Sequence, residues 1–332
     1  MFVDMYEYLD SDPDIGRGDF ISSVLSAGEV GGELYYLFES IRLNTLVGKT
    51  ENIGNAAGWG LAEYLDMAEN LADGVYMICN EKRQYTYEKV IKPALVEFVD
   101  YESATCTFDS ELFIRVLNYL KSLPYTPVEF YSSERVSKEL TDEIAMTEPI
   151  TINEFTMYAL PRALFGTEEI SFIGYPNRGN IIEASKGYAI SAQSGKEIRD
   201  GAWQFIKHVI LNQDVTSISG FPVMYDVYRG YAENSQKGYY LLGPGYTMAS
   251  SNTEFAQEEA DSRRTIKAQM TQKDTDDLLA LIEAVEPSRA LDAAIAKIIE
   301  EETANFYGGA KTAAETAAII QNRASIYLSE RK

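Results

Sequence analysis

The sequence predicts an α/β fold, because short strand-like runs alternate with helical segments before an all-helical C-terminal region. The chain has 332 residues, of which 45% are hydrophobic and 24% charged, as in ordinary globular proteins. This length allows two domains. We therefore expect sheets covered by helices, in up to two domains.

In the first half of the chain, a strand-like run extends from Leu34 to Val47, after a Gly-Gly turn. Helical spacing of apolar residues predicts helices after Gly58, over 86–99 and from a cap at Asp109. The last of these helices should bury one face. Its predicted core residues are Phe113, Val116, Leu117 and Leu120. Residues 124–150 are polar and contain prolines, so a loop is expected there.

In the second half, the runs "ISFIGYP" and "GYAIS" predict two short strands. A capping box from Ser194 to Glu197 predicts the start of a helix, and Trp203 is expected to pack in the core. The chain is helical from about residue 273, with a second capping box at Thr312. The apolar side predicted for the helix after Ser194 consists of Ile198, Ala202, Phe205, Ile206, Val209 and Ile210.

The loop 174–179, Gly-Tyr-Pro-Asn-Arg-Gly, has the glycine spacing of a phosphate-binding loop. Such a loop needs Lys and then Ser or Thr after the second glycine, where this chain has Asn180 and Ile181. Pro176 also lacks the backbone N–H that would bind an anion. We therefore expect a turn without a nucleotide.

The composition argues against several partners and cofactors. A formal net charge of −22 disfavours nucleic acid and anionic membrane surfaces, which attract Lys and Arg. His208 is the one histidine, and Cys79 and Cys106 are the two cysteines, so no metal or redox motif is present. We expect no cofactor and no metal. Whether the two cysteines pair is left open by the sequence, although unpaired thiols are favoured.

An acidic stretch near the N-terminus superficially resembles a calcium loop, because Asp10, Asp12 and Asp14 alternate. The EF-hand loop requires Gly and Glu at two positions that are Ile15 and Ile21 here. An acidic turn is therefore expected. The first residues also show neither the basic nor the apolar segment of a secretion signal, and no apolar run is long enough to span a membrane.

Several segments resemble, in the same order, parts of the extracellular solute-binding proteins of ABC importers, in the carbohydrate-type, maltose-binding-protein-like group. These segments are "FESIRLNTLVGK" followed by "GWGLAEYL", then "FVDYESATCTFDSELFIRVLNYLKSLP", "GYAISAQSGKEIRDGAWQFIKHVI" and "IIEEETANFYGGAKTAAETAAIIQNRASIYLSE". Gly60 departs from the family pattern, which has a capping Thr at this helix start. Trp59 before it is interpreted as a buried anchor of that helix.

The resemblance implies a periplasmic-binding-protein-like type II fold, in which two α/β lobes hold ligand in the cleft between them. It assigns 1–34 and 178–232 to a partial lobe 1, and 35–177 and 233–332 to lobe 2. A secretion signal and about a hundred residues of lobe 1, roughly a small domain, would precede residue 1 in such a protein. The loop 174–179 is then expected to be a hinge crossing between the lobes.

The function implied is capture of a mono- or oligosaccharide outside the cell and its delivery to ABC permease subunits. The resemblance further implies a monomeric lipoprotein, anchored to the membrane in its full-length form, that is not an enzyme. Tyrosine rings stack on sugar C–H faces, while Arg, Ser and Asn bind hydroxyls. The ligand-binding residues expected on these grounds are Ser40, Arg42, Tyr85, Tyr87, Tyr175 and Asn177.

Other interpretations remain open at this point. Arg42 is equally well explained by a surface salt bridge, and at least one of Tyr85 and Tyr87 by core packing. A carbohydrate hydrolase needs two inward carboxylates, which 51 acidic residues do not exclude. The other alternative is a truncated binding protein without ligand-binding activity. A Ser–His–Asp hydrolase is disfavoured, because no G-x-S-x-G elbow is present.

Overall fold

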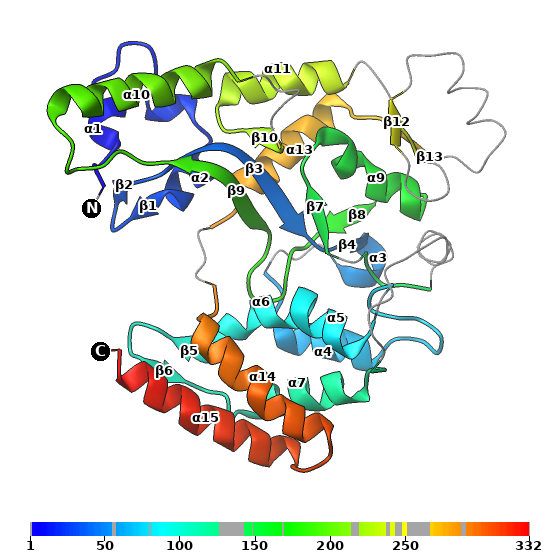
Figure 1. The fold of residues 1–332 in the computed structure, drawn as a ribbon. Coiled ribbons are helices and arrows are strands. Elements are labelled where there is room, and N and C mark those ends of the chain that lie inside the picture. Colours follow the sequence, from blue (N-terminus) through cyan, green and yellow to red (C-terminus); the bar gives the residue numbers. More distant parts are fainter. Residues whose placement is uncertain are drawn as a thin grey trace. The chain divides into compact units, whose positions relative to one another are not determined.

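The computed structural model describes most of the chain, and its helices and strands are labelled in Figure 1. The described residues are 2–54, 58–79, 81–125, 143–147, 149–167, 169–213, 219–236, 240–242, 248–250, 266–286 and 290–331. The predicted loop at 124–150 lies largely outside them.

The chain forms two compact units, which we call unit 1 and unit 2. Unit 1 consists of Met1–Thr45, Ile150–Glu168 and Asn180–Pro287; unit 2 consists of Leu46–Pro149, Glu169–Gly179 and Ser288–Lys332. Residues 1–34 and 180–232, which were expected to share a lobe, lie in unit 1, whereas 178–179 lie in unit 2. However, 35–45, 150–168 and 233–287 also belong to unit 1, whereas the sequence had placed them with the other lobe. Contacts between segments distant in the chain produce this difference.

A single long strand organises unit 1. The strand β3 (Leu37–Thr45) pairs antiparallel along its whole length with β9 (Ile181–Tyr188), from Leu37↔Tyr188 to Asn44↔Ile181. Its other edge pairs with β10 (Phe221–Pro222) and β7 (Ile150–Ile152). This pairing explains why 35–45 joins unit 1. The strand β9 lies earlier than the strand predicted from "GYAIS", and it ends at Tyr188.

The remaining elements of unit 1 are short strands and helices that surround this sheet (Figure 1). Helix α13 (Gln272–Glu283) contacts α2 (Ser22–Ala27) and α9 (Phe155–Phe165), which explains why the segment after 233 joins unit 1. The strands are β1 (Glu29–Val30), β2 (Glu33–Leu34), β11 (Tyr240–Leu242), β12 (Met248–Ser250) and β13 (Ile266–Ala268). The helices are α1 (Tyr6–Leu9), the 3-10 turn Arg17–Asp19, α2 (Ser22–Ala27), α9 (Phe155–Phe165), α10 (Lys196–Leu211), α11 (Tyr225–Ser235) and α13 (Gln272–Glu283).

Helix α10 buries only part of the face that its sequence suggested, because Ile206 and Ile210 are buried while two other residues of that face are exposed. Trp203, Ile206 and Ile210 are its buried residues, which confirms Trp203 as core. By contrast, Ile198 and Phe205 are 67% and 59% exposed. Apolar residues occur around most of this helix, so spacing alone did not decide which side packs against the unit. The helix also begins after Gly195, which has no side-chain cap, so the capping box predicted at Ser194 was wrong.

Unit 2 is mainly helical around a small aromatic core. The rings of Phe98, Phe108 and Phe113 lie between 5.1 and 5.7 Å apart, centre to centre. Helix α7 (Glu111–Ser122) buries the four residues that its spacing predicted. The other elements are β4 (Val47–Lys49), α3 (Thr50–Ile53), α4 (Leu61–Glu69), α5 (Arg83–Thr86), the π-helical turn Tyr87–Ile91, α6 (Lys92–Ala94), the 3-10 turn Leu95–Phe98, β5 (Val99–Asp100), β6 (Thr105–Cys106) and β8 (Ile170–Phe172).

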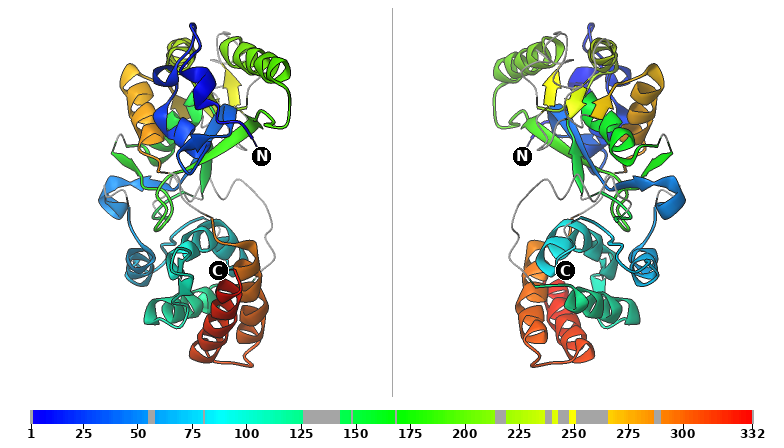
Figure 2. Two further views of the ribbon diagram at one scale, coloured as in Figure 1. Left: turned by 90° about the vertical axis from the view of Figure 1, so that its left-hand side faces the viewer. Right: turned by 90° about the vertical axis from the view of Figure 1, so that its right-hand side faces the viewer.

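The C-terminal part of unit 2 is the helix pair α14 (Ala293–Tyr307) and α15 (Ala313–Ser329), which lie side by side in Figures 1 and 2. The capping box at Thr312 is confirmed, because its hydroxyl accepts the Glu315 N–H while the Glu315 carboxylate accepts the Thr312 N–H. Cys79 and Cys106 are not joined by a disulfide. No helix in the described ranges is long and apolar enough to span a bilayer.

Candidate functional site

The two site residues predicted in unit 1, Ser40 and Arg42, lie on the same face of β3 and share a partner. The Ser40 hydroxyl donates to the Ser219 carbonyl oxygen at 3.3 Å, and Arg42 Nε donates to the same oxygen at 3.2 Å. Arg42 Nη2 also donates to Ser219 Oγ at 2.7 Å. Residues at i and i+2 of a strand point to the same side, so the sequence could predict this pair but not Ser219.

The polar face continues across three strands. Arg42 Nη1 lies 3.8 Å from Glu183 Oε1, and Asn44 Nδ2 donates to Glu183 Oε2 at 3.3 Å. Thr151 donates to Asn44 Oδ1 at 2.6 Å. The register explains these contacts, because Arg42 is opposite Glu183 on β9 and Asn44 is opposite Thr151 on β7. We call Ser40, Arg42, Asn44, Thr151, Glu183 and Ser219 the polar strip.

The polar strip offers groups that bind hydroxyls. A planar guanidinium donates hydrogen bonds, a carboxylate accepts them, and an amide does both. The side chains of Arg42 and Glu183 are 31% and 56% exposed, so both are accessible to solvent. Their separation of 3.8 Å makes a weak surface ion pair, as one interpretation of Arg42 proposed. The ion pair and a ligand-binding role for Arg42 are compatible.

The loop 174–179 forms a tight turn at the end of a unit-2 segment. Tyr175 N–H donates to the Gly179 carbonyl at 2.7 Å, and Gly179 N–H donates back to Tyr175 at 2.9 Å. Gly174, Asn177 and Gly179 have positive φ angles of 71°, 57° and 60°, which glycine and asparagine adopt most readily. The unit boundary falls directly after this turn. The positive φ angles therefore explain the glycines of this turn, whereas its expected role as a hinge crossing stays a prediction.

The same turn is attached to the start of α4. Trp59 is 7% exposed and donates from Nε1 to the Gly174 carbonyl at 3.1 Å, while Asn177 N–H donates to the Trp59 carbonyl at 2.8 Å. These bonds confirm Trp59 as a buried anchor. At Gly60, a Cβ atom would lie 2.9 Å from Asn177 Oδ1 and 2.8 Å from Glu63 Oε2. Both atoms are the ends of flexible side chains that can shift, so the structure does not explain why glycine stands where the family pattern has threonine.

Asn177 is exposed and its side chain contacts one acidic residue. Its Nδ2 donates to Glu97 Oε2, and burial together with the nearby Glu63 carboxylate raises the pKa of Glu97. Tyr175, in contrast, is 8% exposed and lies largely inside unit 2. The turn thus brings the two predicted residues close together, but presents only the Asn177 side chain to solvent.

Tyr85 and Tyr87 are both 8% exposed. Tyr87 lines a cavity of about 520 Å³ within unit 2, between the α5 region and the second half of α14. Its hydroxyl is buried and has no hydrogen-bond partner. Tyr85 does not line this cavity, in agreement with the interpretation that one of the pair packs in the core. The other residues around the cavity are Arg83, Gln84, Glu88, Tyr125, Glu300, Thr303, Ala304 and Tyr307.

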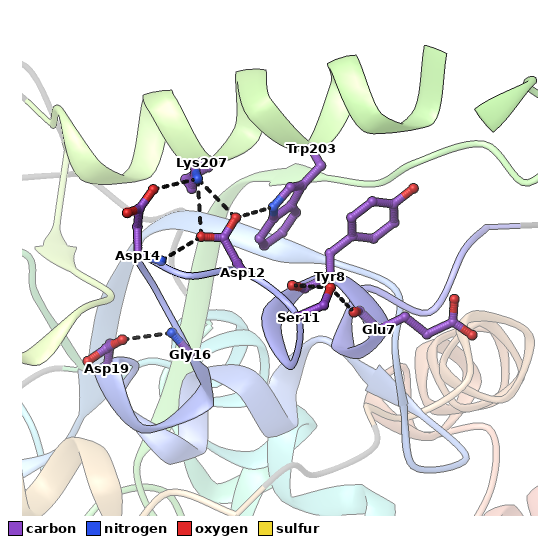
Figure 3. A network of polar contacts seen from close by, with 9 residues as sticks. All are labelled: Glu7, Tyr8, Ser11, Asp12, Asp14, Gly16, Asp19, Trp203 and Lys207. Carbon is purple, nitrogen blue, oxygen red and sulfur yellow. Dashed lines mark hydrogen bonds and ion pairs between the residues drawn. The ribbon is translucent and has the colours of Figure 1, made fainter. Parts of the chain in front are cut away.

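The acidic stretch near the N-terminus is a bonded turn, as Figure 3 shows. Asp12 accepts hydrogen bonds from Trp203 Nε1 at 2.7 Å and from Lys207 Nζ at 2.9 Å, and Lys207 also bonds Asp14 at 2.9 Å. Asp10 pairs with Arg17 at 2.5 Å. These carboxylates are thus neutralised by protein groups. Within the described ranges, no group of three or more His, Cys, Asp or Glu side chains is arranged to hold a metal ion.

Solved structures of similar fold now allow the architecture to be named. A periplasmic oligogalacturonide-binding protein from Yersinia enterocolitica has a TM-score of 0.53 at 14% identity; the match covers 99% of this chain and 80% of that one. The sugar-binding protein MalE from Xanthomonas citri has a TM-score of 0.51 at 12% identity, with the same coverage. The chain has the fold of ABC-transporter sugar-binding proteins.

A third example of this sugar-binding-protein fold is an ABC-transporter solute-binding protein from Thermotoga lettingae, solved with α-D-tagatose. Its TM-score is 0.50 at 13% identity, and the match covers 98% of this chain and 80% of that one. The predicted α/β, periplasmic-binding-protein-like type II fold is therefore confirmed. The sequence itself matches no protein-family model and no curated protein.

Proposed function

We propose that the chain is the extracellular substrate-binding component of an ABC transporter and captures a mono- or oligosaccharide for import. The observation that carries the proposal is the likeness in fold, over 98–99% of the chain, to proteins named as oligogalacturonide-binding, sugar-binding and tagatose-bound. Those proteins are binding proteins, which fits a role without catalysis. The partners would be permease subunits, and the full-length protein would be a monomer held at the membrane by a lipid.

The polar strip supports a ligand rich in hydroxyl groups. Arg42 supplies N–H donors, Glu183 supplies acceptors, and Asn44 supplies both kinds of group. Sugars carry hydroxyls that donate and accept, so a neutral sugar can satisfy all three side chains. The proposed ligand-binding residues remain Ser40, Arg42, Tyr85, Tyr87, Tyr175 and Asn177, to which the strip adds Asn44, Thr151, Glu183 and Ser219.

The test is calorimetric titration of the chain with a panel of mono- and oligosaccharides, and with amino acids and short peptides for comparison. We expect heat of binding with at least one sugar and none with amino acids or peptides. Bound ligand should also stabilise the folded chain, by about 2.7 kcal/mol at a hundredfold excess over Kd. Binding of peptides in preference to all sugars would refute the substrate class. Hydrolysis of a glycoside would refute the role as a binding protein.

The variant Arg42→Ala tests whether the polar strip holds the ligand. Loss of hydrogen bonds from a charged group typically costs about 1.5–3 kcal/mol, so affinity should fall at least about tenfold. Arg229→Ala is the matched control, because Arg229 is also in unit 1 but lies on α11 with a side chain 63% exposed. Equal affinity of the two variants would remove Arg42 from the site.

A further inference from the structure

The cavity beside Tyr87 is formed entirely by unit 2. Its volume of about 520 Å³ lies within the range of small-molecule sites, roughly 300–1,000 Å³. Three tyrosine rings line it, namely Tyr87, Tyr125 and Tyr307. Aromatic faces with a few polar groups around them are typical of sites that hold a ring-shaped ligand.

The charges around the cavity are already paired. Lys92 Nζ lies 3.0 Å from Glu88 Oε2 and 2.9 Å from Glu300 Oε1, so it bridges the two acidic side chains. Arg83 donates to the carbonyl oxygens of Leu120 and Lys121, both at 2.9 Å. Two cations thus balance two carboxylates, and a charged ligand would find no unmatched partner.

The protein's own cations also occupy positions over the rings. The Arg83 guanidinium carbon lies 4.5 Å from the centre of the Tyr307 ring and 5.7 Å from that of Tyr125. Lys92 Nζ lies 5.8 Å from the centre of the Tyr87 ring. A cationic ligand would have to displace these groups to reach the rings, so the cavity does not resemble an open aromatic cage.

A ligand in this cavity should therefore be uncharged and bind through hydrogen bonds and ring contacts. Glu300 has a second oxygen that is not used by Lys92, whereas Glu88 Oε1 accepts a hydrogen bond from Gln84 Nε2 at 3.3 Å. The buried Tyr87 hydroxyl has no partner, and an unmade hydrogen bond of this kind costs about 1–3 kcal/mol. A ligand hydroxyl next to the ring would offer this group the partner that the protein lacks. Tyr87 also belongs to a π-helical turn, a feature often found at functional sites.

We propose that this cavity is a binding site for one neutral polyhydroxylated molecule, a single sugar ring or a sugar alcohol. The site lies within unit 2 alone and requires no residue of the polar strip. It therefore goes beyond the proposed function, with which it shares Tyr87 and the chemical class of the ligand. The ring would stack on tyrosine, and one of its hydroxyls would donate to the Glu300 oxygen that Lys92 does not bind.

The exposed face of helix α14 offers a matched pair of variants. Ala304 lines the cavity and is exposed, so Ala304→Trp should fill the opening without disturbing the core. Asn305 is the next residue, is also exposed and does not line the cavity, so Asn305→Trp adds the same bulk elsewhere. Tyr87→Phe keeps the ring and removes only the hydroxyl, which provides a second variant if the tryptophan perturbs folding.

Binding is measured by saturation-transfer NMR on the full chain with glucose, mannitol, choline and citrate as separate probes. We expect transfer to glucose or mannitol in the wild type, in Asn305→Trp and in Arg42→Ala. Affinity should fall at least tenfold in Ala304→Trp and about tenfold in Tyr87→Phe. Preference for choline or citrate, or unchanged polyol binding in Ala304→Trp, would overturn the inference.

The two proposals fail in different ways. Polyol binding that is lost in Arg42→Ala but kept in Ala304→Trp supports the polar strip and refutes the cavity. Binding lost in Ala304→Trp but kept in Arg42→Ala supports the cavity, and leaves the proposed import function to its own titration panel. Absence of any polyol binding in the wild type would refute the cavity proposal outright.

Discussion

The two units use charged residues in opposite ways. In unit 1, the Arg162–Asp274 pair has an N–O distance of 2.5 Å, and the Asp274 side chain is only 2% exposed. In unit 2, Arg115 binds Asp66 at the same distance, but the two side chains are 33% and 65% exposed. A buried pair is costly to break because one desolvated charge remains, whereas an exposed pair contributes little. The N–O distance alone therefore does not show which ion pair contributes more to stability, because the two pairs differ in burial.

Unit 2 relies instead on apolar packing. Its Phe98, Phe108 and Phe113 cluster and the buried face of α7 contain no charged side chain. Among the described large apolar residues that remain exposed, six of nine belong to unit 1, including Ile198 and Phe205 on α10. The comparison teaches that ion pairs of the same length can differ widely in burial, as Asp274 in unit 1 and Asp66 in unit 2 do. The following predictions test it.

The largest expected effect is that of Arg162→Met. Removal of the guanidinium leaves Asp274 as an uncompensated buried carboxylate, so the free energy of unfolding should fall by about 3–5 kcal/mol. Arg323→Met in unit 2, where the side chain is 38% exposed, should cost at most about 1 kcal/mol. Denaturant unfolding gives both values, and hydrogen exchange locates the loss. Equal costs for the two variants would contradict the comparison.

The corresponding test in unit 2 is Leu117→Ala. Leu117 is 1% exposed on α7, and the cavity left behind should cost about 2–5 kcal/mol. Amide exchange should increase mainly in unit 2. Ile326→Ala on α15 is the control, because Ile326 is 52% exposed and its truncation should change stability little. The two-unit description would be wrong if exchange rose equally in unit 1.

A change of pH should have a smaller effect on the free energy of unfolding, and the effect should have opposite signs in the two units. Burial opposes ionisation of Asp12, but bonds from Trp203, the Asp14 N–H and Lys207 lower its pKa from 3.8 to about 2. Its contribution to unit 1 is therefore complete above pH 3.8 and is lost as pH falls toward 2. Burial raises the pKa of Glu81, although Tyr119 and the Met77 N–H partly offset this.

For Glu81, the folded state binds its proton more tightly than the unfolded state, so this contribution to unit 2 grows as pH falls through the raised pKa. Unfolding monitored by hydrogen exchange across pH should show both trends. In Asp12→Asn, the stability of unit 1 should fall less steeply as the pH is lowered. In Glu81→Gln, the stability of unit 2 should rise less steeply as the pH is lowered. The roles assigned to Asp12 and Glu81 would be wrong if stability changed with pH in the same direction in both units and neither variant altered that change.

The smallest effect should come from Arg115→Gln. Arg115 also binds Glu69, at 2.8 Å, but its partners are more than half exposed. Exposed pairs are worth about 0.2–1 kcal/mol and are screened by salt. The loss of stability should therefore stay below about 1 kcal/mol and shrink further in 1 M salt. A loss of stability close to that of Arg162→Met would show that burial does not determine how much each ion pair contributes.

Part of the candidate site could be predicted from the sequence. Strand alternation placed Ser40 and Arg42 on one face, and their side chains do share Ser219. The glycines around Asn177 marked a turn, which the structure confirms. Glu183 and Thr151 were missed because only strand register places them opposite Arg42 and Asn44. The face predicted for α10 was only partly right, because apolar residues on several sides of the helix make periodicity ambiguous.

Local patterns along the chain were sufficient to predict the α/β class, the apolar face of α7 and the turn at 174–179. These features follow from backbone propensities and from periodicity over a few residues, which any local stretch encodes. Only the tertiary structure decided that 35–45 pairs with 181–188, that Asp274 is buried against Arg162, and that Tyr87 borders a cavity. Each of these depends on partners distant in the chain, and packing, not local preference, selects such partners.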